Sequence, residues 1–271
     1  MRRIAPAFEA LSRSGSGAYV PYICAGDPDT DFTLELAKRL CNAGADILEL
    51  GLPFSDPVAD GPVIQEAMAR SLSAGFKVAH VFETISSLRR AGIRQPIVVM
   101  TYFNPVHKFG IAEFCGRLAS SGGDGILVVD LPIEESEDLE RSADRNDLDI
   151  IRLVTPTTDD RRLRSILAKA SGFVYIVSVA GVTGAREGFD GGVSGLVGRV
   201  TELSKLPTAV GFGISNPEQV RRALATGASG IVEGSALISS YSSLLGDRDQ
   251  ALRAVERHSK SMKDAASALK A

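Results

Sequence analysis

The sequence predicts a single (β/α)8 barrel domain over residues 1–271, with an N-terminal helix and an insertion after the second strand. Eight short apolar runs recur along the chain, each after a helical segment, and most are about 20 to 35 residues apart. They are rich in Val, Ile and Leu, which is typical of parallel strands buried on both faces. An open doubly wound sheet is the alternative, but no G-x-G-x-x-G motif follows the first run. The barrel is therefore favoured.

A repeated pattern marks the starts of the strands. Residues 43–48, 121–127 and 226–232 each give a helix end, a glycine, a polar residue and then an apolar run. Glycine is common where a helix ends and the chain turns. The predicted strands are Ala18–Ala25, Ile47–Leu50, Pro96–Met100, Ile126–Leu127, Asp149–Val154, Phe173–Val177, Pro207–Gly211 and Ile231–Val232.

Apolar residues at helical spacing predict helices between these strands. The first, Ile4–Ser12, precedes the barrel, and Asp31–Ala43 follows the first strand. The second and third strands lie unusually far apart, so the segment between them is expected to hold Val63–Ala74 as well as Val78–Ala91. The insertion begins with the loop after the second strand, a place where α/β enzymes carry lids and partner surfaces.

Composition argues against nucleic-acid and membrane functions. The net charge is −3 and no long basic tract occurs, so no nucleic-acid partner is expected. No run of about 18 apolar residues is present, so no membrane span is expected. Cys24, Cys41 and Cys115 have neither metal-ligand spacing nor an even count. They indicate reduced thiols in a cytoplasmic protein.

Three acidic residues near predicted strand ends are candidates for chemistry. Glu49 lies in the second apolar run, Asp60 in the loop that follows it, and Asp130 after the fourth run. Glu49 could instead form a structural ion pair, Asp60 could cap the helix that begins near Pro62, and Asp130 could form a turn. A carboxylate in a buried strand is costly unless it is paired or used. Because Glu49 stands near the end of such a strand, we favour the hypothesis that Glu49 and Asp60 form an acid/base pair.

Glycine-bearing loops at the ends of the last three strands predict a phosphate site. They are Gly181–Gly184, Gly211–Gly213 and Gly234-Ser235. Backbone N–H groups in such loops can approach an anion, and a helix that starts at Ser235 would direct its dipole towards it. Barrel loops are often glycine-rich for other reasons, but phosphate sites after strands 7 and 8 recur in this fold.

Residues missing from the strand ends disfavour two aldolase mechanisms. No lysine lies at a predicted strand end, which argues against a Schiff-base aldolase. His80, His107 and His258 are scattered without metal-ligand partners, which argues against a zinc-dependent aldolase. Carboxylate acid/base chemistry on a phosphorylated substrate remains.

Several motifs recur in the order found in one known family. The longest is PFSDPVADGPVIQ at residues 53–65. The others are AGDP at 25–28, YFNP at 102–105, DG at 124–125, DLP at 130–132 with EE at 134–135, GVTG at 181–184, GFGI at 211–214 and GSA at 234–236. Together these motifs cover most of the chain, and the sequence resembles the α subunit of tryptophan synthase.

The resemblance implies reversible retro-aldol cleavage of indole-3-glycerol phosphate to indole and glyceraldehyde 3-phosphate. It implies that Glu49 moves protons at indole C3 and the glycerol hydroxyl, and that Asp60 holds the indole N–H. It implies no metal and no cofactor in this chain, because the substrate's own imine accepts the electrons. By position it implies substrate contacts at Tyr22, Met100, Tyr102, Leu127, Tyr175, Thr183 and Phe212, and phosphate contacts at Gly184, Gly213, Gly234 and Ser235.

The resemblance also implies a partner. This would be a β subunit that carries pyridoxal phosphate, receives indole through a tunnel and assembles with this chain as an α2β2 heterotetramer. Segment 178–192, with five glycines, would form a mobile loop that closes over Asp60. Partner contacts are expected at Pro53, Asp56, the loop around Asn104, and Pro132.

Glu233 departs from the family pattern, since a small uncharged residue is expected before Gly234-Ser235. Alternation along the strand would point its side chain away from the pocket into the helix layer. An unpaired acid there is costly.

Two other function classes stay open at this stage. A phosphosugar isomerase would share the phosphate loops without needing the long insertion. A regulatory subunit would alter its partner's rate without making indole.

Overall fold

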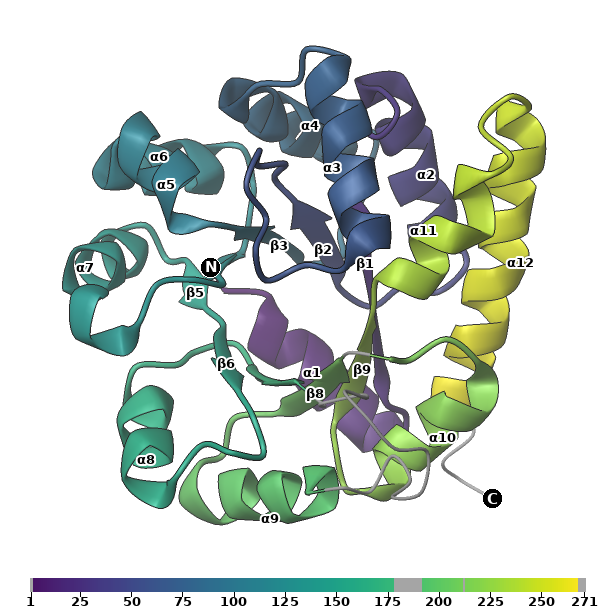
Figure 1. Ribbon diagram of the computed structural model, residues 1–271. Helices are drawn as coiled ribbons and strands as arrows, with labels where there is room; N and C mark the ends of the chain where they lie inside the picture. Colours follow the sequence, from purple (N-terminus) through teal and green to yellow (C-terminus); the bar gives the residue numbers. More distant parts are fainter. Residues whose placement is uncertain (1, 178–191, 212, 268–271) are drawn as a thin grey trace.

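The computed structural model describes residues 2–177, 192–211 and 213–267. Within these ranges nine strand segments form one parallel sheet in the order β5-β4-β3-β2-β1-β9-β8-β7-β6 (Figure 1). The two end segments, β5 (Asp149–Ile150) and β6 (Arg152–Val154), are separated only by Ile151. They are two halves of one predicted strand, so the sheet closes on itself. The predicted (β/α)8 barrel is confirmed.

The remaining strands lie close to their predicted positions, and nearly all of their residues are buried, as the apolar runs predicted. Tyr22 of β1 lies beside Glu49 of β2, which in turn lies beside Val98 of β3. These strands are β1 (Ala18–Cys24), β2 (Leu48–Gly51), β3 (Ile97–Thr101), β4 (Gly125–Val128), β7 (Val174–Val177), β8 (Thr208–Gly211) and β9 (Gly230–Glu233).

Helices surround the sheet (Figure 1). Among the residues that the structure describes, no helix is long and apolar enough to cross a membrane. The α-helices are α1 (Ile4–Ser14), α2 (Thr30–Asn42), α3 (Pro62–Ser73), α4 (Val78–Arg90), α5 (Phe103–Phe109), α6 (Ile111–Ser120), α7 (Glu137–Arg145), α8 (Asp160–Ala168), α9 (Val193–Leu203), α10 (Pro217–Ala225), α11 (Ser235–Ser242) and α12 (Arg248–Ser267), and a 3-10 helix, η1, spans Ile133–Glu135.

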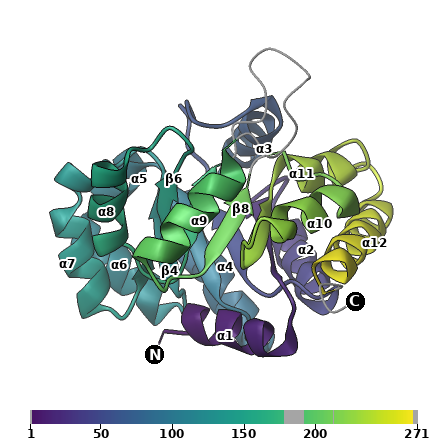
Figure 2. The same ribbon diagram turned by 90° about the horizontal axis from the view of Figure 1, so that it is seen from below.

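The barrel interior is filled by alternate residues of the strands, as the period of two requires. Val20, Ile47 and Val98 pack there against Ile4 and Phe8 of α1. Helix α1 closes the end at which the strands begin, and α3 lies at the opposite end (Figure 2). A second, larger layer of core lies between the strands and the surrounding helices.

The insertion after β2 contains α3 and α4, as predicted. The expectation that Asn104 lies in a loop is wrong, because it lies on α5. The Asp130 carboxylate accepts a hydrogen bond from the Phe103 backbone N–H at 2.7 Å and so satisfies the first turn of α5. This partner comes from the turn after β4, which the local sequence around Asn104 does not reveal.

Glu233 points into the helix layer, as alternation predicted, and it is fully buried. It is not unpaired there. Its Oε1 contacts Nε2 of His258 on α12, and its Oε2 accepts a hydrogen bond from the Tyr19 hydroxyl at 2.8 Å. The unusual acid thus has two partners, which offset the cost of burying its charge.

Candidate active site

A cavity of about 370 Å³ lies at the carboxyl ends of the strands. It contains both predicted acids, Glu49 from β2 and Asp60 from the loop before α3. Its lining residues are Tyr22, Glu49, Asp60, Ile64, Met100, Tyr175, Gly213, Ile214, Ser215, Val232, Gly234, Ser235, Ala236 and Ser239. Residues predicted from strands one, two, three, six, seven and eight therefore meet in one place.

Glu49 is buried without a partner for one of its oxygens. Glu49 is only 1% exposed, and its Oε1 has no hydrogen-bond partner. Within the described residues Glu49 forms no ion pair, so they give no support to the structural ion-pair interpretation. Burial first, and then the nearby charge of Asp60, raise the Glu49 pKa from 4.5 to about 8. A carboxyl group with this pKa is mostly protonated at neutral pH and can both give and take a proton.

Asp60 is held by Tyr102. The Tyr102 hydroxyl donates to Asp60 Oδ2 at 2.6 Å and accepts from the Ala59 backbone N–H at 3.0 Å. The Asp60 pKa is raised above its ordinary value, chiefly by burial, and the hydrogen bond from Tyr102 lowers it in part. Helix α3 has Gly61 as its N-cap, without a side-chain cap, so the helix-capping interpretation of Asp60 is not supported. Tyr102 itself is outside the lining of the cavity and acts on Asp60.

Two tyrosines form walls of the cavity, and glycines make room for them. A β-carbon at Gly51 would lie 2.2 Å from the Tyr22 hydroxyl oxygen, and one at Gly211 would lie 2.2 Å from the Tyr175 hydroxyl oxygen. The hydroxyl of Tyr22 is buried and has no partner. The pKa of Tyr22 is raised by burial first and then by the charges of neighbouring residues that include Asp60 and Glu49, so its hydroxyl stays protonated.

Of the other described residues predicted to form the walls, one lines the cavity and one does not. Met100 lines the cavity, whereas Leu127, its neighbour on β4, lies in the barrel interior outside the lining. The predicted positions Thr183, Gly184 and Phe212, together with most of segment 178–192, lie outside the described residues.

Part of the cavity lining consists of residues predicted for phosphate. Gly213, Gly234 and Ser235 all line it, and Ser235 begins α11. The first turn of this helix presents unpaired N–H groups and the positive end of its dipole. This arrangement suits an anion, and it leaves the space between α11 and the two acids for the rest of a substrate.

Six lining residues were not predicted from the sequence. Ser239 follows Ser235 by four positions and so shares its helix face, a spacing that could have revealed it. Four of the others lie within two positions of a predicted residue, Gly213, Gly234 or Ser235, and only Ile64 comes from a separate element, α3. These residues are Ile64, Ile214, Ser215, Val232, Ala236 and Ser239.

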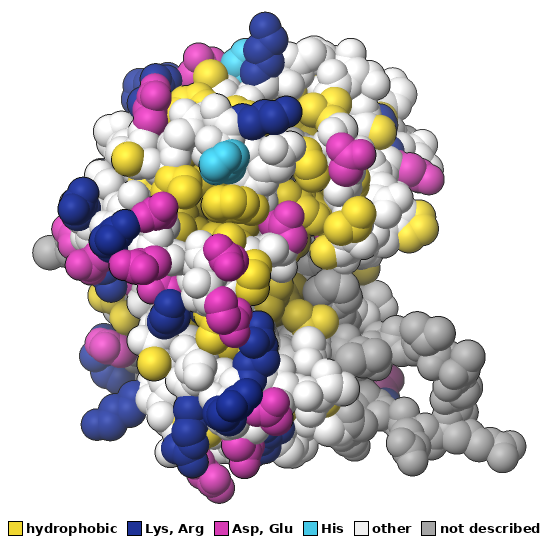
Figure 3. Space-filling model, turned by 60° about the vertical axis from the view of Figure 1, so that its left-hand side comes forward, with side chains coloured by type: hydrophobic (Ala, Val, Ile, Leu, Met, Phe, Trp, Pro, Cys, Tyr) yellow, Lys and Arg dark blue, Asp and Glu magenta, His cyan; other side chains and the backbone are white. Residues whose placement is uncertain are grey.

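Two of the residues predicted for a partner, Pro53 and Asn104, line a second cavity of about 490 Å³ together with Phe54 and Phe109. Asp56 and Pro132 are exposed. Figure 3 shows hydrophobic side chains gathered between charged ones on the face formed by the left-hand side of Figure 1.

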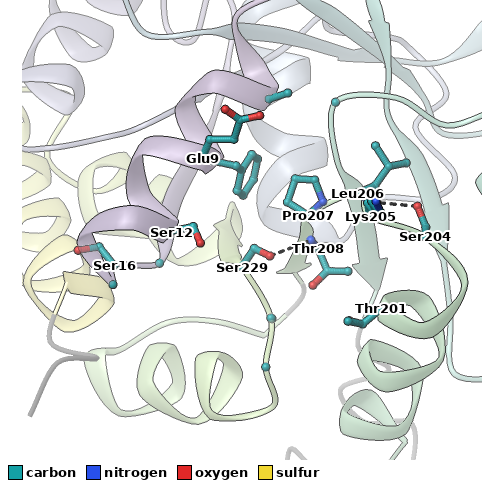
Figure 4. A pocket seen from close by; sticks show the side chains of 17 residues that line it. Glu9, Ser12, Ser16, Thr201, Ser204, Lys205, Leu206, Pro207, Thr208 and Ser229 are labelled. Carbon is teal, nitrogen blue, oxygen red and sulfur yellow. Dashed lines mark hydrogen bonds between the residues drawn. The ribbon is translucent and has the colours of Figure 1, made fainter.

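A larger cavity, of about 780 Å³, lies at the other end of the barrel (Figure 4). It is lined by α1 residues such as Glu9 and Ser12 and by segments that enter strands, including Lys205–Thr208 and Ser229. None of the predicted site residues is there. Barrel enzymes carry their chemistry at the carboxyl ends of the strands, so this cavity is not the candidate active site.

The described ranges contain no group of three or more His, Cys, Asp or Glu side chains that could hold a metal ion.

The family model for the tryptophan synthase alpha chain matches residues 8–267. The chain belongs to the tryptophan synthase alpha chain family. A tryptophan synthase alpha chain from Gluconobacter oxydans is 45% identical over 271 residues, which is 100% of both chains. One from Synechococcus is 47% identical over 235 residues, 87% of each chain.

Solved structures of tryptophan synthase have the same fold. The alpha subunit from Legionella pneumophila superposes with a TM-score of 0.88 at 35% identity, covering 98% of each chain. A chain of tryptophan synthase from M. tuberculosis, in its aminoacrylate- and BRD0059-bound form, gives a TM-score of 0.87 at 29% identity, again covering 98% of each chain. The alpha-chain family therefore accounts for the whole barrel, including the insertion after β2.

Proposed function

We propose that Glu49 and Asp60 carry out the alpha reaction of tryptophan synthase in this chain. As a member of the alpha-chain family the protein is a lyase of tryptophan biosynthesis, which cleaves indole-3-glycerol phosphate reversibly to indole and glyceraldehyde 3-phosphate. The phosphosugar isomerase hypothesis is thereby excluded. The residue assignment rests on one observation: a buried Glu49 carboxyl group, whose Oε1 has no hydrogen-bond partner, shares a cavity with Asp60.

Glu49 supplies both proton transfers in this proposal. As an acid it protonates C3 of the indole ring, and as the resulting carboxylate it takes the proton of the adjacent glycerol hydroxyl. The bond between C3 and that carbon then breaks, its electron pair returns to the ring, and the hydroxyl carbon becomes the aldehyde. A pKa of about 8 suits a group that must act in both directions near neutral pH.

Asp60 stabilises the positive charge that develops on the ring nitrogen. Its carboxylate accepts a hydrogen bond from the indole N–H. The hydrogen bond from Tyr102 keeps that carboxylate oriented and helps to keep it ionised. Tyr22, Tyr175 and Met100 pack against the flat ring. Leu127 supports this wall from the barrel interior, beside Met100, rather than by direct contact.

The phosphate group binds at the N-terminus of α11 in this proposal. The backbone of Gly213 and Gly234 and the hydroxyl of Ser235 line that side of the cavity. Gly184 as a further phosphate contact, and Thr183 and Phe212 as substrate contacts, remain predictions from the sequence.

The alpha chain needs no cofactor of its own, since pyridoxal phosphate belongs to the beta subunit with which the family assembles. We propose that the beta subunit docks on Pro53, Asp56, Asn104 and Pro132, in an α2β2 heterotetramer. The exposed side chains of this region and the cavity lined by Pro53 and Asn104 support that surface. We further propose that residues 1–271 fold as one domain and that the protein is cytoplasmic, as its three free cysteines favour.

The experiment is indole release from indole-3-glycerol phosphate by the wild type, Glu49→Gln and Asp60→Asn, each with and without the beta subunit. Loss of a general acid/base is expected to lower kcat by about 10²- to 10⁴-fold. Glu66→Gln, the same substitution at an exposed position on α3, is the control and should keep its activity.

Two results would contradict the assignment. Turnover within about tenfold of the wild type in Glu49→Gln or Asp60→Asn would remove that residue from the chemistry. A wild-type chain that raises the rate of the beta subunit but releases no indole would identify a regulatory subunit instead. Far-UV circular dichroism of each variant separates lost chemistry from lost folding.

A further inference from the structure

Asp27 is a fully buried acid that the proposed chemistry does not use. It lies in the turn between β1 and α2, and its carboxylate accepts three hydrogen bonds. Two come from Arg70, from Nε to Oδ1 at 2.7 Å and from Nη2 to Oδ2 at 2.9 Å. The third comes from the Tyr241 hydroxyl to Oδ2 at 2.8 Å. One carboxylate therefore joins two side chains that are far apart in the sequence.

The two donors belong to two neighbouring helices that follow different groups of residues in the candidate active site. Arg70 is on α3, which begins directly after the Asp60-Gly61 pair. Tyr241 is on α11, which begins at Ser235 on the phosphate side. Both helices lie near the same rim of the barrel, side by side in Figure 1. Helix α3 is an insertion, so the regular alternation of strands and helices does not by itself fix its distance from α11.

The turn that holds Asp27 is itself fixed against α3. The Ser71 hydroxyl donates to the Ala25 carbonyl at 2.6 Å, and the Gly26 N–H donates to the Thr33 hydroxyl at 2.9 Å. Gly26 has a φ of +80°, and a β-carbon there would lie 2.3 Å from the Phe76 ring. The carboxylate of Asp27 thus has a defined position relative to the end of β1, from which it can set the positions of both helices.

We propose that Asp27 is a positioning residue for the alpha reaction: through Arg70 and Tyr241 it sets the separation between the Asp60 side and the phosphate side of the cavity. The proposal rests on the function proposed above. The planar guanidinium of Arg70 matches the carboxylate with two parallel bonds, which restricts orientation as well as distance. A substrate anchored at both ends is sensitive to this separation, because a displacement of about 1 Å can cost about 10²-fold in rate.

The experiment uses the full-length chain in the direction of synthesis, where indole and glyceraldehyde 3-phosphate are varied independently. Tyr241→Phe cuts only the link to α11, and a several-fold higher KM for glyceraldehyde 3-phosphate is expected with the KM for indole unchanged. Arg70→Lys replaces the two-bond contact with one donor on α3. A higher KM for indole and a kcat lower by about tenfold are expected, with the KM for glyceraldehyde 3-phosphate unchanged.

Asp27→Asn weakens both links and should change both KM values. Two matched controls lose comparable contacts elsewhere. Tyr19→Phe removes a hydrogen bond to a buried carboxylate in the helix layer, and Arg39→Lys alters an ion pair between α2 and α12. Both controls should keep wild-type kinetics, whatever they do to stability.

The proposal is overturned if the Tyr241 and Arg70 variants lower the unfolding midpoint while kcat and both KM values stay at wild-type levels. It is also overturned if each variant changes the two KM values equally. Should Asp27→Asn fail to fold, the two single-link variants still decide. Activity retained in Glu49→Gln and Asp60→Asn would refute the proposed function instead, so the two failures can be told apart.

Discussion

Glu49→Gln is expected to stabilise the folded chain at alkaline pH. The folded state raises the Glu49 pKa from 4.5 to about 8 because the carboxyl group is buried near Asp60. Between these values the folded state binds the proton more tightly than the unfolded state, so the free energy of unfolding falls as the pH rises. At 1.36 kcal/mol for each pH unit, the loss above pH 8 reaches at most about 5 kcal/mol. Glutamine stays neutral and avoids this loss.

The assay is urea unfolding of the wild type and Glu49→Gln at pH 5 and at pH 9. A constant effect of the amide on packing is the same at both pH values, so the change in the difference between variants isolates the ionisation of Glu49. The stability gain of the variant should be larger at pH 9 than at pH 5 by several kcal/mol. Glu66→Gln, which is exposed, should show no such dependence. An equal gain at both pH values would refute the argument that ionisation of Glu49 destabilises the folded state.

Two further predictions concern hydrogen-bonded acids. Tyr102→Phe removes the donor that lowers the Asp60 pKa, so that pKa should rise and the acid limb of the pH–rate profile for indole release should move to higher pH. An unmoved limb would mean that Asp60 does not control it. His258→Gln should lower stability at pH 6 by up to about 3 kcal/mol, since it leaves the buried charge of Glu233 without its cation. The His258 pKa is raised, chiefly by its hydrogen bond to Glu233, so this loss should be full below pH 6.5 and shrink as the pH rises through the folded-state pKa. If the urea midpoint of His258→Gln lies below that of the wild type by the same amount at pH 6 and at pH 9, this prediction is wrong.

The proposed chemistry requires a carboxyl group at Glu49, although burial of that group lowers the stability of the fold. A neutral or apolar side chain would suit this buried position better. The orphan oxygen of Glu49 and the unpartnered hydroxyl of Tyr22 are polar groups that a substrate could satisfy. Residues that weaken the fold in this way are expected where a ligand completes the hydrogen bonds.

Some features could be predicted from the sequence because they depend on near neighbours. The apolar runs and their spacing predicted the barrel, and the long gap after β2 predicted α3 and α4. Alternation along β9 correctly pointed Glu233 away from the pocket. Glu49 was recognisable because a lone acid in an apolar run has few uses other than pairing or chemistry.

Other features depend on partners that come together only in the folded chain. Helix α5 stands where a loop was expected and its Phe103 N–H donates to Asp130 from the turn after β4, and Asp60 is oriented by Tyr102, which follows β3. Leu127 lies beside Met100 in the barrel interior instead of in the cavity wall.

The sequence by itself determined the order of strands and helices, the strand ends at which the acids stand and the glycine loops on the phosphate side. Local periodicity and turn chemistry suffice for these. Only the tertiary structure decided that Glu49 lacks a partner, that Glu233 has two, and that Asp27 joins α3 to α11. The physical reason is that burial and hydrogen-bond pairing are properties of the space around a side chain, and closure of the barrel creates that space.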